Sequence, residues 1–339
     1  MTGQAGGARS GPAAVTSGGS GPGQRGKLPR MSSRGAPSVF VVGSVNQDYV
    51  LSVERRPKPG ETLSGAVLAL HPGGKGANQA VAAVLLGARV ALLGRVGDDP
   101  AGASLRAELA ARGVDTAAVG TTGGVSTGAA FITVTPDGEN AIVVALGANH
   151  RLTAGDVDAV AGSIRSAAVL VAQLEVPLEV VGRAVEVAAG AATRVVLNLA
   201  PARPVPDALL ARVDVLVVNA HEAGFLLGEE VDGVEAAMRA AEDLRGRGPE
   251  AVIVTLGAAG AVLAGADGPG HVPAPPANVV DTTGAGDAFI GALAAELAAG
   301  ASLRDAVALG VRAGAAAVQA KGAQSSFPTA ADLRPNPGL

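Results

Sequence analysis

The chain has 339 residues, of which 48% are hydrophobic and 2% aromatic, and its formal net charge is −4. This length can bury a sizeable core, whereas the charge excludes a generally basic nucleic-acid-binding surface. The chain has no cysteine, which excludes a disulfide framework and a cysteine nucleophile and agrees with a cytoplasmic location. No apolar run reaches the roughly 18 residues of a membrane span, so we expect neither a nucleic-acid nor a membrane partner.

Residues 1–36 differ in composition from the rest of the chain. They are mostly Gly, Ser, Ala and Pro, with several Arg and Lys and no acidic residue. Such a segment buries too little apolar surface to fold, and it lacks the apolar stretch of a secretory signal. Its GxGxxG match at 21–26 follows no strand and contains a proline, so we interpret it as chance. We expect a disordered tail, or one that weakly contacts an acidic surface, followed by a single folded domain over 37–339.

From residue 39 onward, apolar runs typical of buried strands alternate with helical patterns. The first run, 39–43, is followed by a helix over 75–86, a strand over 89–94 and a helix over 99–113. The later strands are expected at 168–172, 194–199, 214–218 and 251–256, separated by helices at 178–190, 205–212, 219–227 and 233–246. This alternation predicts an α/β fold with a mainly parallel sheet covered on both faces.

Two regions interrupt this alternation. Segments 49–53 and 62–70 are predicted to form one antiparallel strand pair, and 127–135 and 140–146 a second. Residues 136–138 carry a Pro-Asp-Gly turn signal between the strands of the second pair. Hairpins outside a parallel sheet predict a second, small β layer.

The motif with the clearest chemistry is Asp281–Asp287, which precedes a helical run over 288–299. Gly284 and Gly286 lack a Cβ, so their backbone N–H groups can approach an anion at a helix N-terminus. Asp287 would then lie beside bound phosphate, where a carboxylate makes sense if it accepts a proton from an attacking hydroxyl. The alternative is an ordinary acidic residue that stabilises a helix start.

A second glycine-rich motif, Gly73–Gln79, opens the predicted helix at 75–86. It lacks the spacing of a P-loop and of a dinucleotide fingerprint. Lys75 and Asn78 could instead hydrogen-bond a polyhydroxylated ligand. The alternative is a glycine-rich turn between a strand and a helix.

Two shorter motifs follow predicted strands, where ligands bind in open α/β sheets. Asn46 and Asp48 follow the first strand and could hold vicinal hydroxyls, with a plain Asx turn as the alternative. Asn219 and Glu222 share one helix face and could hold Mg²⁺ through water. Helix capping by Asn219 is the alternative there.

Together, Gly73–Gln79 and Asp281–Asp287 resemble the two signature motifs of the ribokinase-like (PfkB) carbohydrate kinase family. Further segments resemble the family in the same order across about 38–328, namely 43–48, 59–62, 97–99, 147–149, 173–175, 198–202, 255–257 and 321–324. The resemblance implies a three-layer α/β/α domain with a small β-sheet lid, its strands at about 47–70 and 127–147. It also implies ATP-dependent phosphorylation of D-ribose at O5, giving ribose 5-phosphate and ADP, in a homodimer joined through the lid.

The resemblance also implies a role for each matching residue. Asp287 would be the catalytic base, and the anion hole would be Gly284, Ala285 and Gly286. The sugar site would comprise Asn46, Asp48, Gly74, Lys75, Gly76, Ala77, Asn78 and Glu175, with Asp287. The ATP site would comprise Asn219, Thr255, Leu256, Gly257, Ala258, Ala259, Gly260 and Val311, with Gly286 and Asp287. Mg²⁺ would be held indirectly by Asn219 and Glu222, and K⁺ by Asp281, Thr283, Ala317, Ala320, Gly322 and Ser326.

Two other functions fit the same residues. The first is a sister kinase acting on another neutral sugar or a nucleoside. Segments 61–72 and 127–147 contain no Lys or Arg, which favours a neutral substrate, and Tyr49 and Phe131 are the aromatic residues there that could cover a base. The second is a non-catalytic sugar-binding protein, which the intact Gly284–Asp287 segment disfavours.

Overall fold

A large, mainly parallel sheet forms the centre of the computed structural model, which describes residues 1–3, 38–136, 140–266 and 268–333. Within these residues, ten strands make up the sheet. In sheet order they are β14 (Gly270–Val272), β13 (Ala261–Ala264), β12 (Ala251–Thr255), β11 (Val215–Asn219), β10 (Arg194–Asn198), β9 (Val169–Ala172), β1 (Ser38–Val42), β4 (Arg89–Gly97) and β5 (Val114–Asp115), with β6 (Val119–Thr122) also paired to β4. In this sheet order, every pair of neighbouring strands from β12 through to β5 is parallel. The pairs β12–β13 and β13–β14 are antiparallel.

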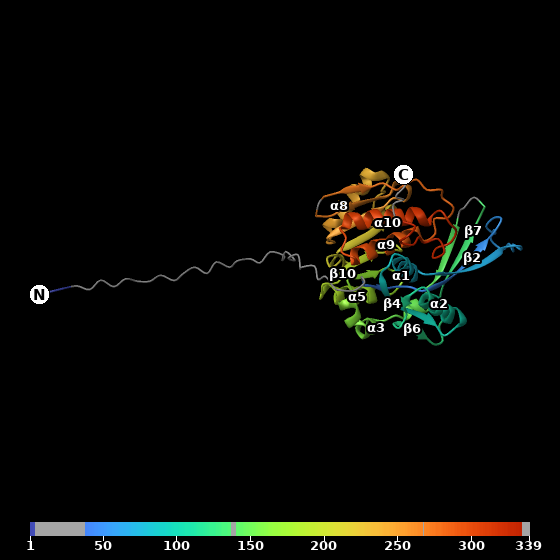
Figure 1. The fold of residues 1–339 in the computed structure, drawn as a ribbon, viewed down its shortest axis with the longest axis horizontal. Helices are drawn as coiled ribbons and strands as arrows, with labels where there is room; N and C mark the ends of the chain where they lie inside the picture. The colour runs from blue at the N-terminus through green and yellow to red at the C-terminus, as the bar shows by residue number, and fades with distance from the viewer. Residues whose placement is uncertain (4–37, 137–139, 267, 334–339) are drawn as a thin grey trace. The chain divides into compact units, whose positions relative to one another are not determined.

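Helices cover both faces of this sheet, because alternate side chains of each strand enter different cores. In β1, Val39 and Val41 belong to one buried cluster, and Phe40 and Val42 to the other. The first cluster includes residues of α1 (Lys75–Leu85), α2 (Pro100–Ala111), α9 (Ala285–Ala298) and α10 (Leu303–Ala317). The second includes residues of α3 (Ala154–Ala159), α4 (Ala161–Ser166), α5 (Leu178–Ala189), α6 (Asp207–Leu210), α7 (Ala220–Leu227) and α8 (Gly233–Gly246). The predicted three-layer α/β/α architecture is therefore confirmed (Figure 1).

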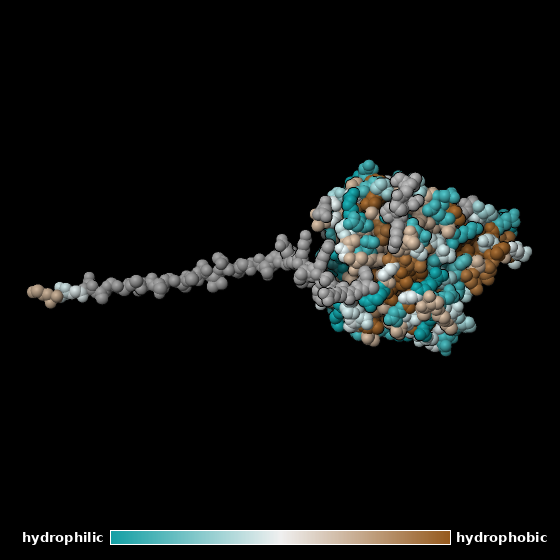
Figure 2. All heavy atoms as spheres, viewed as in Figure 1, coloured by the Kyte–Doolittle hydropathy of each residue, from teal (hydrophilic) through white to brown (hydrophobic). Residues whose placement is uncertain are grey.

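A second, four-stranded sheet projects beside the helices and is called the lid below (Figure 1). Its order is β3 (Val67–Gly73), β2 (Asn46–Ser52), β7 (Gly128–Val134) and β8 (Asn140–Ala145). The two antiparallel pairs, β2–β3 and β7–β8, agree with the predicted hairpins, and a parallel pairing of β2 with β7 joins them. Hydrophobic side chains gather on the surface of this sheet (Figure 2).

Two expectations need correction, and two others fall largely outside the described residues. Segment 62–66 is not a strand, because Gly65 adopts φ 87° and the chain becomes extended in the ladder only from Val67. Asn46 and Asp48 lie within β2 and not in an Asx turn after β1, because the chain passes directly from the sheet into the lid. The predicted tail, apart from residues 1–3, and most of the 136–138 turn lie outside the described residues.

No helix in the described ranges combines the length and apolarity needed to cross a bilayer.

Candidate active site

Polar residues gather where five parallel strands end, at one edge of the large sheet. Ser44, Gln173, Asn198, Asn219 and Thr255 end or closely follow β1, β9, β10, β11 and β12. The helices α1, α7 and α9 begin at the same edge, so their free N–H groups add a favourable field for an anion. This edge is where ligands bind in open α/β sheets.

Asp287 is the central side chain of the site. It lies in the first turn of α9, is 9% exposed, and accepts hydrogen bonds of 2.9 Å from Asn78 Nδ2 and from Gln79 Nε2 of α1. The two signature motifs, separated by about 200 residues, therefore meet at one carboxylate. Burial raises the pKa of Asp287, and the nearby Lys75 together with these two hydrogen bonds opposes that effect.

The start of α9 leaves room beside Asp287. Gly284 caps the helix with φ 78°, a conformation that favours glycine, and a Cβ there would lie 2.8 Å from Ala323 Cβ. A Cβ on Gly286 would meet no atom within 4 Å. A cavity of about 140 Å³ opens here. Its polar or glycine lining is Lys75, Asn198, Asn219, Glu222, Thr255, Gly284, Gly286 and Asp287.

The start of α1 packs unusually closely against the end of β1. Gly74 adopts φ 89°, and a Cβ on Gly76 would lie 2.6 Å from the backbone of Gly43 and Ser44. Glu175 accepts hydrogen bonds from Ser44 Oγ and from the backbone N of Lys75. Gly76, Ala77 and Asn78 are buried behind this turn. The turn thus brings Lys75, and Glu175 hydrogen-bonded to its backbone, near Asp287.

Asp48 reaches this cluster from the lid strand β2. Its Oδ1 is buried without a hydrogen-bond partner in the described structure, and a Cβ on Gly73 would lie 2.2 Å from its Oδ2. Burial, followed by the carboxylates of Glu175 and Asp287, raises the pKa of Asp48 to about 7, while Lys75 acts in the opposite direction. An unpaired carboxyl held in this way is available to hydroxyl donors of a ligand.

Asn46, also on β2, is held by a network outside the predicted site. Its Oδ1 accepts a 2.7 Å hydrogen bond from Asn149 Nδ2, and Asn149 Oδ1 accepts from Val45 N. Because the oxygen of Asn46 is engaged, its NH₂ group is the part free to meet a ligand. Asn149 lies in the 3₁₀ turn η1 (Gly147–Arg151), which immediately precedes α3.

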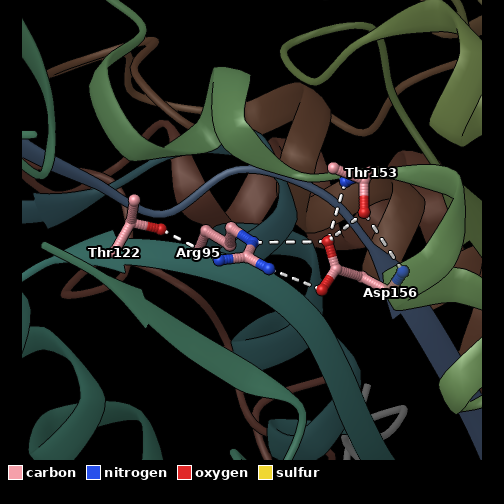
Figure 3. A network of polar contacts seen from close by, with 4 residues as sticks. All are labelled: Arg95, Thr122, Thr153 and Asp156. Atoms are coloured by element: carbon pink, nitrogen blue, oxygen red, sulfur yellow. Dashed lines mark hydrogen bonds and ion pairs between the residues drawn. The ribbon is translucent and has the colours of Figure 1, made fainter.

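The start of α3 is fixed to the sheet by an ion pair (Figure 3). Arg95 of β4 bonds Asp156 at 2.6 Å and Thr122 of β6 at 3.0 Å. Asp156 in turn forms a capping box with Thr153. This network holds the start of α3, and therefore the preceding turn that carries Asn149, against β4.

Asn219 and Glu222 form a capping box at the start of α7. Asn219 Oδ1 accepts from Glu222 N, and Glu222 Oε2 accepts from Asn219 N, each at 2.8 Å. The capping alternative is therefore realised, but it engages only Oε2 of the Glu222 carboxylate, and Glu222 also lines the cavity together with Asn198. Oxygen donors of this type fit a hydrated Mg²⁺ ion. Burial raises the pKa of Glu222.

The residues assigned to K⁺ lie on two segments that Asp281 joins. Its carboxylate accepts from Thr283 N at 2.9 Å and from Gly322 N at 2.8 Å. Burial would raise the pKa of Asp281, but these hydrogen bonds hold it below its usual value. Ala317 and Ser326 are buried and Ala320 is exposed. An ionised carboxylate with nearby backbone oxygens fits a monovalent cation in donor chemistry.

The segment predicted to line the nucleotide is only partly at the cavity. Thr255 lines it, whereas Gly257, Ala258 and Ala259 form the exposed turn η2 (Gly257–Ala259), which follows Leu256 and ends at the buried Gly260. Val311 is buried in α10 within the same core cluster as Phe289 and does not line the cavity. The helix that carries Val311, α10, packs against α9.

Comparison with known proteins identifies the family. The model of the pfkB family carbohydrate kinases matches residues 36–330. The chain belongs to this family. It is 40% identical over 292 residues to a ribokinase of Haemophilus influenzae, covering 86% of this chain and 95% of that protein. It is 37% identical to a deoxyribokinase of Salmonella typhi, with the same coverage of both chains.

A solved structure supports the same assignment. The structure of Arabidopsis thaliana ribokinase complexed with ribose and ATP matches with a TM-score of 0.81 and 32% identity. The match covers 88% of this chain and 97% of that chain. As a pfkB carbohydrate kinase, the chain is an ATP-dependent sugar kinase.

The sequence alone did not identify several polar residues of this candidate site. Gln79, Gln173, Asn198 and Gln324 are hydrogen-bonded close to Asp287, but none was predicted as a site residue. Each lies in a segment that carried the family resemblance, which was the available signal. Their role depends on burial and pairing, which a single sequence does not display.

Proposed function

We propose that this chain transfers the γ-phosphoryl group of ATP to O5 of D-ribose, giving ribose 5-phosphate and ADP. The main support is that Asp287 lies between the turn at 73–79 and the cavity at the start of α9. A sugar held at the first feature and a phosphate held at the second would meet at this carboxylate. The ribokinase relative at 40% identity supports ribose as the sugar.

In this proposal Asp287 accepts the proton of the primary hydroxyl as the new O–P bond forms. Base assistance of this kind contributes about 10²–10⁴-fold. The N–H groups at Gly284, Ala285 and Gly286 receive the charge that develops on the transferring phosphoryl group. Lys75 adds a positive charge on the sugar side of the same site. Positioning and electrostatics supply most of the acceleration in phosphoryl transfer.

The sugar is held by groups from both sheets. Asn46 and Asp48 of β2 present an amide donor and a carboxyl acceptor, and Glu175 faces them from the large sheet. The backbone of Gly74–Asn78 completes this side. No Lys or Arg occurs in 61–72 or 127–147, which agrees with an unphosphorylated sugar.

ATP occupies the side lined by Asn219, Thr255 and Gly286 in this proposal. Asn219 and Glu222 would hold Mg²⁺ through water, and the ion would supply positive charge to offset that of the phosphates. The segments around Asp281 and Gly322 would hold K⁺, and Asp281 joins these segments by accepting hydrogen bonds from the backbone N of Thr283 and of Gly322.

A substrate panel tests the proposal. ADP release is measured for wild-type protein with ribose, 2-deoxyribose, other neutral sugars and nucleosides, each with and without K⁺. We expect the highest kcat/KM with ribose. The deoxyribokinase relative at 37% identity makes 2-deoxyribose the second candidate. A higher kcat/KM with deoxyribose or a nucleoside would overturn ribose as the substrate and keep the kinase chemistry.

Sugar binding is expected to weaken as the pH falls below about 7, because Asp48 has a pKa of about 7. The ionised carboxylate accepts hydrogen bonds from two hydroxyls, and protonation removes that ability. The KM for ribose should therefore rise roughly tenfold between pH 8 and pH 6, as for one ionising group. Asp48→Asn should show a high KM that no longer varies with pH. A pH-dependent KM in that variant would assign the effect to another group.

The lid supports a homodimer. Because neighbouring strand residues alternate between faces, Leu68, Leu70, Phe131 and Val143 lie on the face opposite Asp48, and all four are exposed. Tyr49 stacks on Phe131 on this face, at 5.1 Å between ring centroids. An apolar face of this kind fits a second copy of the same face.

Val143→Glu should therefore convert the dimer into a monomer in sedimentation velocity. Phe225→Glu on α7 is the matched control, because Phe225 is also large, apolar and 49% exposed but lies outside the lid. A wild-type monomer, or a Val143→Glu dimer, would contradict a lid-mediated dimer.

A further inference from the structure

Two hydrogen-bonded series of buried amide side chains end at the carboxylate of Asp287. Gln173 is 0% exposed, Gln79 1%, Gln324 4% and Asn78 6%. They come from the segment after β9, from α1 and from the loop after α10. Four separate stretches of sequence, including Asn198 at the end of β10, thus converge behind the Asp287 carboxylate of α9. Buried amides are costly unless paired, so this convergence requires a specific arrangement.

In the first series, each amide donates its hydrogen bond toward Asp287. Gln173 Nε2 donates to Gln79 Oε1 at 2.6 Å, and Gln79 Nε2 donates to Asp287 Oδ1 at 2.9 Å. Gln79 Nε2 also donates to Asn198 Oδ1 at 3.0 Å. Rotating the Gln79 amide by 180° would place its oxygen against two acceptor oxygens, those of Asp287 and Asn198. The orientation with Nε2 toward Asp287 is therefore the one that pairs both polar atoms of Gln79, although Gln173 Oε1 at the start of this series is buried without a partner in the described structure.

In the second series, each amide also donates toward Asp287. Gln324 Nε2 donates to Asn78 Oδ1 at 3.0 Å, and Asn78 Nδ2 donates to Asp287 Oδ2 at 2.9 Å. Each carboxylate oxygen thus receives one neutral N–H donor and retains a lone pair for another hydrogen. A cation bonded directly to these oxygens would hold the carboxylate more strongly and compete with proton acceptance. Neutral donors fix the geometry with less loss of basicity.

We propose that Gln79, oriented by Gln173, is a positioning residue that aims the free lone pair of Asp287 Oδ1 at the hydroxyl to be phosphorylated. This inference rests on the proposed function, because it assumes that Asp287 accepts a proton from the sugar. Gln79 itself acts through Asp287 and need not touch substrate. Gln173 acts one step further back, since its hydrogen bond selects the orientation of the Gln79 amide.

Loss of the Gln79 donor should also change the pH at which Asp287 ionises. The other charged groups that face this cluster are Lys75 of α1, Glu175 after β9, Asp48 of β2 and Glu222 of α7. These groups remain in a Gln79 variant. Since a donor to a carboxylate favours its ionised form, removing the donor raises the pKa of Asp287. The acidic limb of the kcat profile, measured at saturating sugar so that protonation of Asp48 does not contribute, should then move to higher pH.

The test compares Gln79→Met, Gln173→Met and Val81→Ala in the full chain. Val81 is buried on the same helix and has no polar contact, so Val81→Ala reproduces loss of packing alone. We expect Gln79→Met to lower kcat by about tenfold, to change the KM for the sugar less than threefold, and to move the acidic limb upward. Gln173→Met should cause a smaller change of the same sign. Val81→Ala should lower the Tm without moving the limb.

A second readout does not depend on turnover. Carbon-13 NMR of labelled aspartate carboxyls, assigned with Asp287→Asn, gives the pKa of Asp287 directly in wild type and in each variant that folds. A higher pKa in Gln79→Met supports the inference even if ribose is not the substrate, and absence of sugar turnover in wild type would refute only the proposed function. An unchanged pKa and unchanged limb in Gln79→Met, or an equal shift in Val81→Ala, would overturn the inference.

Discussion

Asp287→Asn is expected to lower kcat for ribose by at least about 10²-fold, the usual contribution of a positioned base. The change is nearly isosteric and removes the proposed acceptor of the hydroxyl proton. Because we propose that the sugar is held chiefly by β2, the turn at 73–78 and Glu175, the KM for ribose should change less than about threefold. Initial rates of ADP release over a range of ribose concentrations separate these two effects.

Thermal unfolding provides the control for this variant. Burial raises the pKa of Asp287 in the folded chain, so the ionised carboxylate costs stability as the pH rises through the folded-state pKa. Asparagine carries no charge, so it removes this cost of burying a carboxylate. Its NH₂ group, however, must face the NH₂ group of Asn78 or of Gln79, which both donate to the aspartate. A folded Asp287→Asn protein with wild-type kcat would remove Asp287 from its proposed role.

The second large effect is expected for Gly286→Ala. A Cβ at this position meets no protein atom within 4 Å and enters the cavity at the start of α9. It would occupy space that we assign to the transferring phosphoryl group, so kcat/KM for ATP should fall by about 10²-fold, comparable to loss of an oxyanion-hole contact. The backbone of Gly286 is helical, and alanine favours helix over glycine. The Tm should therefore be equal to or above that of wild type.

Gly284→Ala is the matched comparison two residues earlier. Gly284 has φ 78°, and an added Cβ would lie 2.8 Å from Ala323 Cβ and from Phe327 Cε1. The left-handed backbone alone costs alanine about 1–2 kcal/mol. This variant should therefore lose Tm, whereas Gly286→Ala loses activity alone. Wild-type kinetics in a folded Gly286→Ala protein would contradict an anion site at this helix start.

Much of the fold was predictable because the strands are buried on both faces. The apolar runs that become β9, β11 and β12 lack alternation, which is typical of a covered parallel sheet. Helix α10 was not predicted, although Gly300 at φ 87° and the capping Ser302 were readable stop and start signals. The parallel β2–β7 pairing joins segments about 80 residues apart, and local patterns do not encode such a contact.

The site shows the same division between local and distant information. The tight turns at 73–76 and 284–286 were predictable, because their glycines lie close together in the sequence and permit such turns. Gln79 and Asp287 are 208 residues apart, and Gln324 and Asn78 are 246 apart. Those pairings exist only once α1, α9 and the loop after α10 have packed together. The amides therefore resembled ordinary helix and loop residues in the sequence.

The proposed position of Asp287 between sugar and phosphate can be tested by a crystal structure of the full chain with ribose and a non-hydrolysable ATP analogue. We expect ribose O5 about 2.6–3.2 Å from the Asp287 carboxylate, with the γ-phosphate on the other side of O5, at the N–H groups of Gly284–Gly286. A sugar whose primary hydroxyl lies remote from Asp287, or a γ-phosphate bound away from the start of α9, would contradict it.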